Sequence, residues 1–351
     1  MKKRLSLLAA LLPVLLLATG CSTWEHNPQP YLVVTGTYVL NGGGPGADAS
    51  LVNYVYQSKD QQPDLFRTAN NKSLGASAED MLCVNGCFYI CATADKVLYK
   101  TDSLGRIQTE IVTPGTPLSP RHITSYKDHL FVTYAEGFVA KIDTATSAIQ
   151  ILEVGGQPNG IAAANDKIYI ALSGATSTTL AVVETRTFAA LPSLTVAANP
   201  RKLLTVSDQV IYLLSDGDGA SVQPLLQVID PKKDEVYSAS SLRNPIDIAA
   251  VPGQIIFVLL SVDGSHFQIR PLEAYSGAAY QENILSSDVQ VEHPVSLSAD
   301  PANGFVFLGE TDSDGKGVVK VFNYKGDYLD TFHSGDSAPA GAYFSTIVEY
   351  L

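Results

Sequence analysis

The sequence predicts an all-β domain built from repeated four-stranded units, a β-propeller, and three observations favour this fold. Six prolines recur at spacings of 38, 42, 45, 49 and 45 residues, which fit the period of propeller blades. They are Pro120, Pro158, Pro200, Pro245, Pro294 and Pro339. Two short apolar segments joined by a turn follow each of the first five prolines. No stretch shows convincing helical periodicity, so no helix is expected.

Each repeat begins in the same register, which predicts seven blades. The paired apolar segments are residues 123–126 and 130–133, 161–164 and 168–171, 203–206 and 210–213, 246–251 and 255–258, and 295–299 and 305–308. An earlier unit, from Glu79 to Ile90, lacks the proline but keeps the pattern around Asn85-Gly86, a strong hairpin signal. Residues 38–41 and 51–54 resemble second and third strands, and residues 339–344 a first strand. Pairing of these N-terminal strands with the C-terminal strand would close the ring and leave few free sheet edges.

The N-terminus predicts export and a lipid anchor. Three basic residues precede an apolar run from Leu5 to Ala18, which is typical of a cleaved signal peptide over residues 1–20 and too short to span a membrane. The segment Ala18-Thr19-Gly20-Cys21 resembles the lipobox of bacterial lipoproteins, which implies lipidation of Cys21. The alternative is a secreted protein with an incidental cysteine. We expect a lipidated N-terminus and spacer over residues 21–31, a propeller over 32–351, and a location in the cell envelope, at the outer membrane on its periplasmic or cell-surface side.

Charge excludes one class of partner. The chain has 23 basic and 35 acidic side chains, and removal of Lys2, Lys3 and Arg4 with the signal peptide changes the balance to 20 minus 35, or −15. An acidic surface repels phosphate backbones, so nucleic acid is not an expected partner.

Three cysteines remain after Cys21, and we predict that they are free thiols. In a hairpin that turns at Asn85-Gly86, Cys83 lies on the opposite sheet face from Cys87 and Cys91. Cys87 and Cys91 are about 13 Å apart at the usual strand rise, too far for a disulfide. Metal ligation by the three is the alternative.

The repeats also resemble a known family. Phe131-Val-Thr-Tyr134 with Val139-Ala-Lys-Ile-Asp143, and Gln157-Pro-Asn-Gly-Ile161 with Lys167-Ile-Tyr-Ile-Ala171, are similar to the YVTN repeats of YncE-like propellers. Residues 38–41 and 50–54, with Pro339 and Phe344, resemble lipoprotein propellers of Bacteroidetes. That group includes BtuG, a surface lipoprotein that captures vitamin B12 for a TonB-dependent transporter. The resemblance implies the fold and suggests a corrinoid ligand, but it transfers no binding residue.

Strand order predicts one candidate binding face, where the starts of first strands and the loops between second and third strands meet. An inner ring around the channel mouth is expected to hold Glu79, Arg121, Asn159, Arg201, Ile246, Val295 and Ala340. An outer ring is expected to hold Asn41, Asp95, Tyr134, Glu136, Ser173, Asp216, Asp218, Asp263, His266, Glu310 and Asp312. The residues chosen as ligand-binding candidates are Glu79, Arg121, Tyr134, Asn159, Arg201, Asp216, Asp263 and Glu310.

Two of these candidates carry the chemical argument. Arg121 and Arg201 could bind a carboxylate, phosphate or amide-rich ligand through paired hydrogen bonds. Alternatively, each pairs with a neighbouring acid and fixes a turn. Tyr134 could stack on a planar ligand or belong to the blade interior. The loops at residues 216–219 and 312–315 resemble part of a calcium loop, although Asp and Gly are also common in tight turns.

A binding function is favoured over catalysis. Gly-x-Ser-x-Gly is absent, and the six histidines are scattered. We therefore expect a lipid-anchored binding protein without catalytic residue, metal or cofactor, which presents one face to a nutrient, to a transporter, or to both. The alternatives are an envelope scaffold that binds only proteins, and a lyase or lactonase that uses His122 with an acid such as Glu79.

Overall fold

The computed structural model describes residues 29–281, 283–286 and 288–350. The expected signal peptide and Cys21 lie outside these residues. Strands dominate the structure, and no helix among the described residues is long and apolar enough to cross a membrane.

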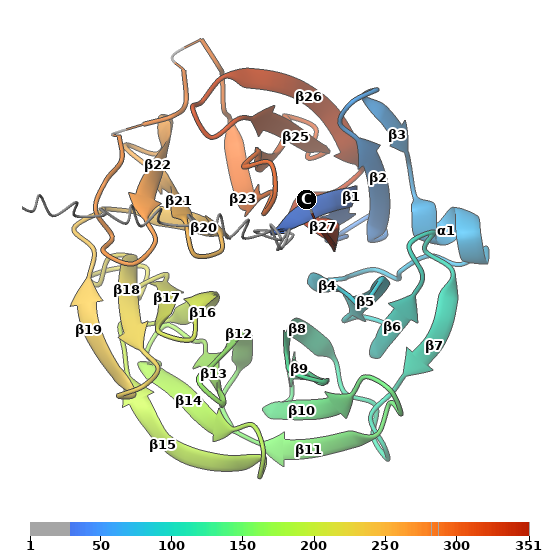
Figure 1. Cartoon of the computed structure of the whole chain (residues 1–351), viewed down its shortest axis with the longest axis vertical. Helices are drawn as coiled ribbons and strands as arrows, with labels where there is room; N and C mark the ends of the chain where they lie inside the picture. Colours follow the sequence, from blue (N-terminus) through green and yellow to red (C-terminus); the bar gives the residue numbers. More distant parts are fainter. Residues whose placement is uncertain (1–28, 282, 287, 351) are drawn as a thin grey trace, which may run out of the picture.

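The strands form seven antiparallel sheets (Figure 1). The first sheet consists of β4(Asp80–Val84), β5(Cys87–Ala92), β6(Val97–Thr101) and β7(Ile107–Ile111). The second consists of β8(Pro120–Tyr126), β9(His129–Tyr134), β10(Phe138–Asp143) and β11(Ile149–Glu153). The third consists of β12(Pro158–Ala164), β13(Lys167–Leu172), β14(Thr179–Glu184) and β15(Ala189–Thr195). The fourth is β16(Pro200–Ser207), β17(Val210–Ser215), β18(Leu225–Asp230) and β19(Glu235–Ala239). The fifth has three strands, β20(Pro245–Val251), β21(Ile255–Ser261) and β22(Phe267–Glu273). The sixth is β23(His293–Ala299), β24(Val306–Thr311), β25(Gly317–Phe322) and β26(Tyr328–Gly335).

The seventh sheet combines the two ends of the chain. Its order is β27(Pro339–Tyr350), β1(Pro30–Asn41), β2(Ser50–Val55) and β3(Asp60–Gln62). Thr37 pairs with Phe344 and Leu40 with Gly341, so residues 339–344 form the first strand and residues 38–41 part of the second. Strand β1 begins at Pro30, two residues inside the segment expected to be spacer.

Buried apolar side chains fill the space between neighbouring sheets. One cluster lies between each pair of consecutive sheets, and another joins the seventh sheet to the first through Tyr38, Leu40 and Phe88. Because each sheet packs on both faces, its central strands are continuously apolar rather than alternating. This is why the sequence shows runs such as Ile168-Tyr-Ile-Ala171.

A bulge follows the proline in each of the inner strands that carry a proline at their first or second position. The register shifts between Pro120 and Ile123 in β8, and between Pro200 and Lys202 in β16; strands β12, β20, β23 and β27 have the same irregularity. A bulge adds one unpaired residue and redirects side chains. Two consecutive side chains after the proline can therefore face the space between the inner strands.

One expectation about secondary structure is wrong. The chain contains a short helix, α1(Leu65–Asn70), between β3 and β4. The Asp64 carboxylate accepts the backbone N–H of Arg67, and Leu65 and Phe66 are buried. The helix was missed because six residues are too few to show a helical period.

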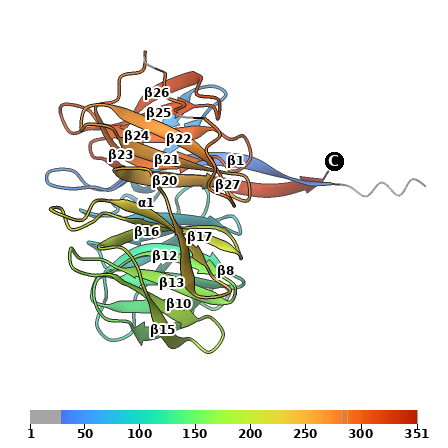
Figure 2. The same cartoon turned by 90° about the vertical axis from the view of Figure 1, so that its left-hand side faces the viewer.

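The β1–β27 pair extends beyond the sheets as a two-stranded ribbon (Figure 2). We call residues 30–35 and 345–350 the ribbon. Strand β2 pairs with β1 only from Thr37 to Asn41, so the ribbon has no third strand among the described residues. Because β1 runs from Pro30 to Asn41, the loop after Asn41 lies at the opposite side of the domain from the ribbon tip.

Candidate functional site

The starts of the inner strands surround a central pocket of about 390 Å³. Its lining includes six of the seven residues expected in the inner ring: Glu79, Arg121, Asn159, Arg201, Val295 and Ala340. Ile246 is not among them, but its carbonyl accepts a hydrogen bond from Arg201 Nη2. The strand order alone therefore identified most of the residues that meet at the centre.

Close approach of two inner strands shapes one wall of the pocket. A Cβ atom at Gly160 in β12 would lie 2.3 Å from the carbonyl oxygen of Arg201 in β16. Only glycine allows these backbones to approach so closely. The contact brings Asn159 and Arg201 to the same pocket.

Both arginines at the pocket pair with an acid. Arg121 Nε donates to Glu79 Oε2 at 2.8 Å, and Arg121 Nη1 donates to the Pro158 carbonyl at 3.3 Å. Arg201 Nε lies 2.8 Å from Asp216 Oδ2. The structure therefore shows the arrangement predicted as the alternative to ligand binding, in which each arginine pairs with a neighbouring acid. The guanidinium groups still line the pocket, so their remaining donors can face a ligand.

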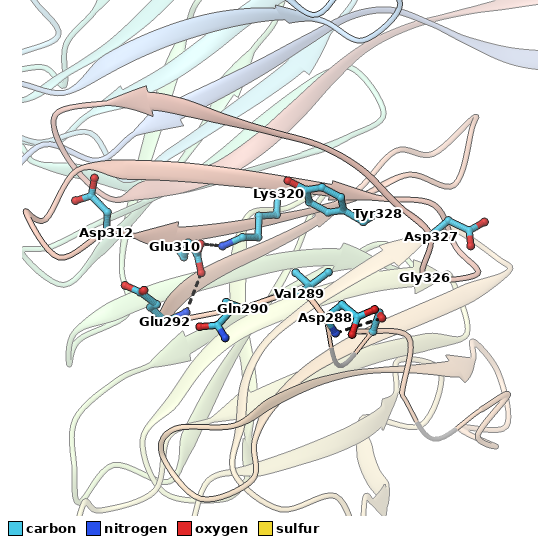
Figure 3. Close-up of a pocket in the computed structure, with 11 residues that line it drawn as sticks. Asp288, Val289, Gln290, Glu292, Glu310, Asp312, Lys320, Gly326, Asp327 and Tyr328 are labelled. Atoms are coloured by element: carbon cyan, nitrogen blue, oxygen red, sulfur yellow. Dashed lines mark hydrogen bonds and ion pairs between the residues drawn. The ribbon is translucent and has the colours of Figure 1, made fainter.

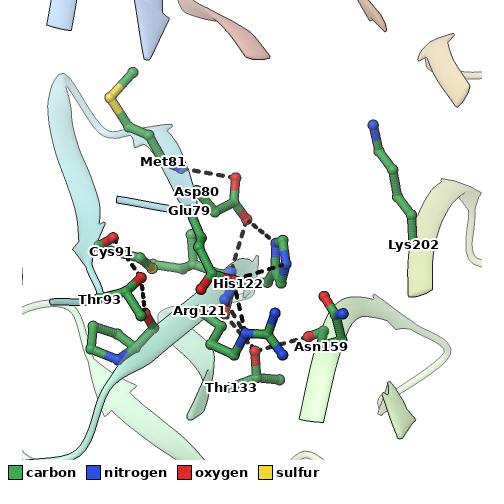
Figure 4. A network of polar contacts seen from close by, with 12 residues as sticks. Glu79, Asp80, Met81, Cys91, Thr93, Arg121, His122, Thr133, Asn159 and Lys202 are labelled. Atoms are coloured by element: carbon green, nitrogen blue, oxygen red, sulfur yellow. Dashed lines mark hydrogen bonds and ion pairs between the residues drawn. The ribbon is translucent and has the colours of Figure 1, made fainter. Parts of the chain in front are cut away.

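An acid that the sequence analysis missed organises the opposite wall (Figure 4). Asp80 accepts the Tyr343 hydroxyl at 2.8 Å and the Ile123 backbone N–H at 3.0 Å. Burial and the adjacent Asp80 carboxylate raise the pKa of Tyr343 well above its ordinary value, so the hydroxyl remains a donor. His122 lies beside this acid, with 3.4 Å between His122 Nδ1 and Asp80 Oδ2 and 3.9 Å between His122 Nε2 and Glu79 Oε2.

The pocket lining also contains an ion pair that the sequence did not predict, between Lys202 and Asp247. Lys202 Nζ donates to both carboxylate oxygens of Asp247, at 2.7 and 2.9 Å. Asp247 is 3% exposed and also accepts the Leu297 backbone N–H at 2.8 Å. Lys202 and Asp247 each follow an expected inner-ring residue by one position. The bulges after the prolines explain why this second position also faces the pocket.

The pocket is rich in charge and balanced in sign. The acids Glu79, Asp80 and Asp247 match the cations Arg121, Arg201 and Lys202 in number, and His122 and the half-buried Tyr343 also line the pocket. Such a lining offers donors and acceptors fixed by their neighbours, and it contains little exposed apolar surface. This arrangement is suited to a polar ligand that brings several hydrogen-bonding groups.

The remaining candidate residues do not join this pocket. Tyr134 is 2% exposed and packs in the blade interior, so its ring cannot stack on a ligand. Asp263 is exposed and accepts hydrogen bonds from Ser265 and His266 in its own loop. Asp216 holds Arg201 without lining the pocket itself. The burial of Tyr134 argues against a direct contact with a ligand, whereas the prediction that Asp216 and Asp263 contact a ligand stays a prediction.

Glu310 belongs to a different, peripheral pocket of about 740 Å³ (Figure 3). It is 4% exposed, forms an ion pair with Lys320, and accepts the Glu292 backbone N–H at 3.1 Å. Burial lowers the pKa of Lys320, although the nearby Glu292 opposes this effect. The pocket is lined by strands β24–β26 with their connecting turns and, from the chain before β23, by Ser286, Asp288, Val289, Gln290 and Glu292. Glu310 is thus separated from the central candidates.

The aspartate-rich loops and the cysteines have structural explanations. The Asp218 carboxylate accepts the Ser221 hydroxyl at 2.7 Å and the backbone N–H groups of Ala220, Ser221 and Val222. These bonds, above all the one from the Ser221 hydroxyl, lower the pKa of Asp218. No group of three or more potential metal-ligating residues gathers in the part of the chain that the structure describes. Cys83, Cys87 and Cys91 are free, and Cys83 lies on the opposite sheet face from the other two.

Comparisons with known proteins identify the kind of fold. A family model described as a domain of unknown function, DUF5074, matches residues 35–191. No curated protein sequence matches the chain. Its structural neighbours are β-propellers. A quinoprotein alcohol dehydrogenase-like protein from Bacteroides thetaiotaomicron is 17% identical, with a TM-score of 0.66 over 88% of this chain and 77% of that one.

Two further solved structures span different functions. Hydrazine synthase of Kuenenia stuttgartiensis is 14% identical, with a TM-score of 0.62 over 78% of this chain and 95% of that one. The WD40 β-propeller domain of Doa1 is 10% identical, with a TM-score of 0.57 over 80% of this chain and 88% of that one. At these identities the likeness establishes the fold alone, and function has to be argued from the site.

Proposed function

We propose that this chain is a lipid-anchored binding protein of the bacterial cell envelope that captures a polar small molecule in its central pocket. The observation that carries the proposal is the convergence of fixed charged groups from several blades on one pocket. A flat apolar patch would favour a protein partner, whereas a concave polar site favours a small ligand. The proposal includes a closed ring of seven blades, which the packing between the seventh and first sheets supports.

A corrinoid is the ligand that we propose to test first. The YVTN-type repeats and the likeness of both chain ends to lipoprotein propellers of Bacteroidetes suggest it. A corrinoid has many amide side chains and, in cobalamin, one phosphodiester, which match carboxylate acceptors and arginine donors. A pocket of about 390 Å³ would receive only part of such a ligand, and the surrounding loops would contact the rest.

The direction of the chain supports a role in capture. Strand β1 enters through the ribbon, on the side opposite the loop after Asn41. An anchor at Cys21 would therefore leave the loop-rich face and the central pocket directed away from the attachment point. In this orientation the pocket is open to ligand in solution, and transfer to a TonB-dependent transporter in the outer membrane would require the propeller to turn on its lipid tether.

A second candidate function has one specific observation in its favour. His122 lies between Asp80 and Glu79 inside the same pocket, and a histidine beside carboxylates can act as a general acid or base. A lyase or lactonase would use this group. Turnover of a lactone or uronate polymer that is lost in His122→Gln would favour catalysis over capture.

Calorimetric titration of residues 22–351 with cyanocobalamin tests the proposal. We expect binding tighter than micromolar, about −8 kcal/mol or better. Replacing both Arg121 and Arg201 by alanine should weaken binding by roughly 100-fold or more, because hydrogen bonds to charged groups contribute about 1.5–3 kcal/mol each. Arg106→Ala is the matched control, since Arg106 pairs with Asp102 on an exposed turn.

The possible results separate the hypotheses. If the double-arginine variant and the unchanged chain bound the ligand with equal affinity, neither arginine would be part of the binding site. Absence of binding would reject the corrinoid and make an envelope scaffold with a protein partner the leading alternative.

A further inference from the structure

We propose that the tip of the β1–β27 ribbon inserts into the headgroup region of the membrane that carries the lipid anchor. The proposal rests on the anchor at Cys21 in the proposed function and adds a second, protein-made contact with lipid. Its occupant is a lipid surface, which the ribbon's composition, its isolation from the sheets and its short distance from the anchor favour.

The ribbon exposes apolar side chains on both faces. Tyr31 and Leu32 are each 38% exposed, Ile347 46%, Val348 55% and Tyr350 67%. Tyr31 and Ile347 lie on one face, and Leu32, Val348 and Tyr350 lie on the other, because cross-strand partners share a face. A surface that is apolar on both sides is unfavourable in water and marks an interaction site.

The ribbon is also isolated from the rest of the domain. Its pairs run from Pro30 with Tyr350 to Val34 with Thr346, and the register shift between Val34 and Gly36 separates it from the seventh sheet. A two-stranded ribbon is marginally stable in water by itself. Six residues per strand make it roughly 20 Å long. The tip can therefore reach a surface that the blades do not touch.

The chemistry of the tip fits the boundary between headgroups and acyl chains. Tyrosine is enriched there because its ring is apolar and its hydroxyl is polar. Glu349 is the only charged residue in the ribbon, and its carboxylate accepts the Tyr31 hydroxyl at 2.7 Å. Aliphatic side chains beside the two tyrosines would bury about 5–10 Å into this boundary, as in other interfacial segments.

The segment between the proposed anchor and the ribbon is short. Cys21 precedes Pro30 by nine positions, which span at most about 30 Å when fully extended. A lipid at Cys21 therefore keeps the ribbon tip near the bilayer. Contact by the ribbon would orient the propeller with its central pocket pointing away from the membrane.

Fluorescence quenching of the full lipidated chain in vesicles tests the proposal. The chain has one tryptophan, Trp24, so Trp24→Phe provides a dark background. Tyr350→Trp then reports on the ribbon tip, and Tyr237→Trp reports on β19, where Tyr237 is 48% exposed. Both variants replace exposed aromatic residues and should preserve the fold. The vesicles are phosphatidylcholine, with or without bromine on the upper part of the acyl chains.

We expect brominated lipid to reduce the Tyr350→Trp emission about two-fold and to leave Tyr237→Trp unchanged, as shallow insertion of the tip requires. Protein that floats with the vesicles but shows unquenched Tyr350→Trp emission would overturn the ribbon contact and leave the anchor intact. That result would favour a ribbon that adds a strand to a protein partner. Protein that fails to float would overturn the anchor and the ribbon contact together, while titration with cyanocobalamin would still test ligand binding separately.

Discussion

The central pocket and the ribbon share strand β27, but the pocket is lined by charged side chains and the ribbon exposes apolar ones. In β27, Tyr343 is half-buried beside Asp80 at the pocket, whereas Tyr350 is 67% exposed at the ribbon tip. In β1, Leu40 is fully buried between sheets, whereas Leu32 is 38% exposed. Along each strand, the number of neighbouring sheets that cover the side chains changes. Within the stack of sheets, neighbouring sheets cover both faces of each strand and polar groups pair. Beyond the sheets, nothing in the described part of the chain covers the apolar side chains of the ribbon.

The largest expected effect tests this difference within one strand. Leu40→Ala removes a fully buried side chain and should reduce the free energy of unfolding by about 3 kcal/mol. Leu32→Ala makes the same chemical change in the ribbon and should cost less than about 0.5 kcal/mol. Guanidinium unfolding of the two variants provides the measurement. Equal losses would show that the ribbon is part of the cooperative core.

The next effect concerns a charged pair at the pocket. Asp247→Ala would leave Lys202 without its partner and the Leu297 backbone N–H without its acceptor. We expect a loss of about 2 kcal/mol, less than for a fully buried pair because the Lys202 side chain is 33% exposed. Glu235→Ala breaks an exposed pair with Lys233 and should cost less than about 0.5 kcal/mol. If the Asp247→Ala variant had the same free energy of unfolding as the unchanged chain, the Lys202–Asp247 pair would not contribute to the stability of the fold.

A third effect, spread over a pH range, concerns buried tyrosines between the sheets. Burial raises the pKa of Tyr38 and of Tyr212 to about 12, above the ordinary value of 10.0. Between these values the unfolded chain loses the phenolic proton and the folded chain keeps it. Stability is therefore full below pH 10 and falls as the pH rises from 10 to 12, by about 1.4 kcal/mol per pH unit for each such tyrosine.

The variant Tyr38→Phe isolates one of these protons. Its free energy of unfolding, measured by denaturant titration at several alkaline pH values, should fall less steeply with pH than that of the unchanged chain. Tyr38 is 5% exposed and donates to the Ser103 carbonyl at 3.2 Å, so the variant also loses one hydrogen bond at every pH. An unchanged slope would contradict the raised pKa of this residue.

The sequence predicted the parts of the fold that repeat. Prolines at the starts of inner strands and paired apolar segments located the first two strands of each blade, and the pairing of β1 with β27 agrees with the expected combination of chain ends. The short helix α1 and the three-stranded fifth sheet did not follow from periodicity, because each is a local departure from it.

The site was predictable in part for the same reason. Arg121 and Arg201 follow a repeated proline, so their place at the centre could be inferred from strand order. Asp80 and Tyr343 meet only because the first and seventh sheets are neighbours, and Lys202 faces the pocket because a bulge shifts its strand. Such placements depend on tertiary packing and local irregularity, for which the sequence carries no separate signal. The burial of Tyr134 likewise depends on the adjacent blade.

The structure of the chain with cyanocobalamin bound is the most direct test of the central claim. The account predicts that the ligand covers the central pocket, with its amide or phosphate groups within hydrogen-bonding distance of Arg121 and Arg201. A ligand bound elsewhere, for example at the cleft beside Tyr275 and Tyr280 on the ribbon side, would contradict the assignment of the central pocket as the binding site.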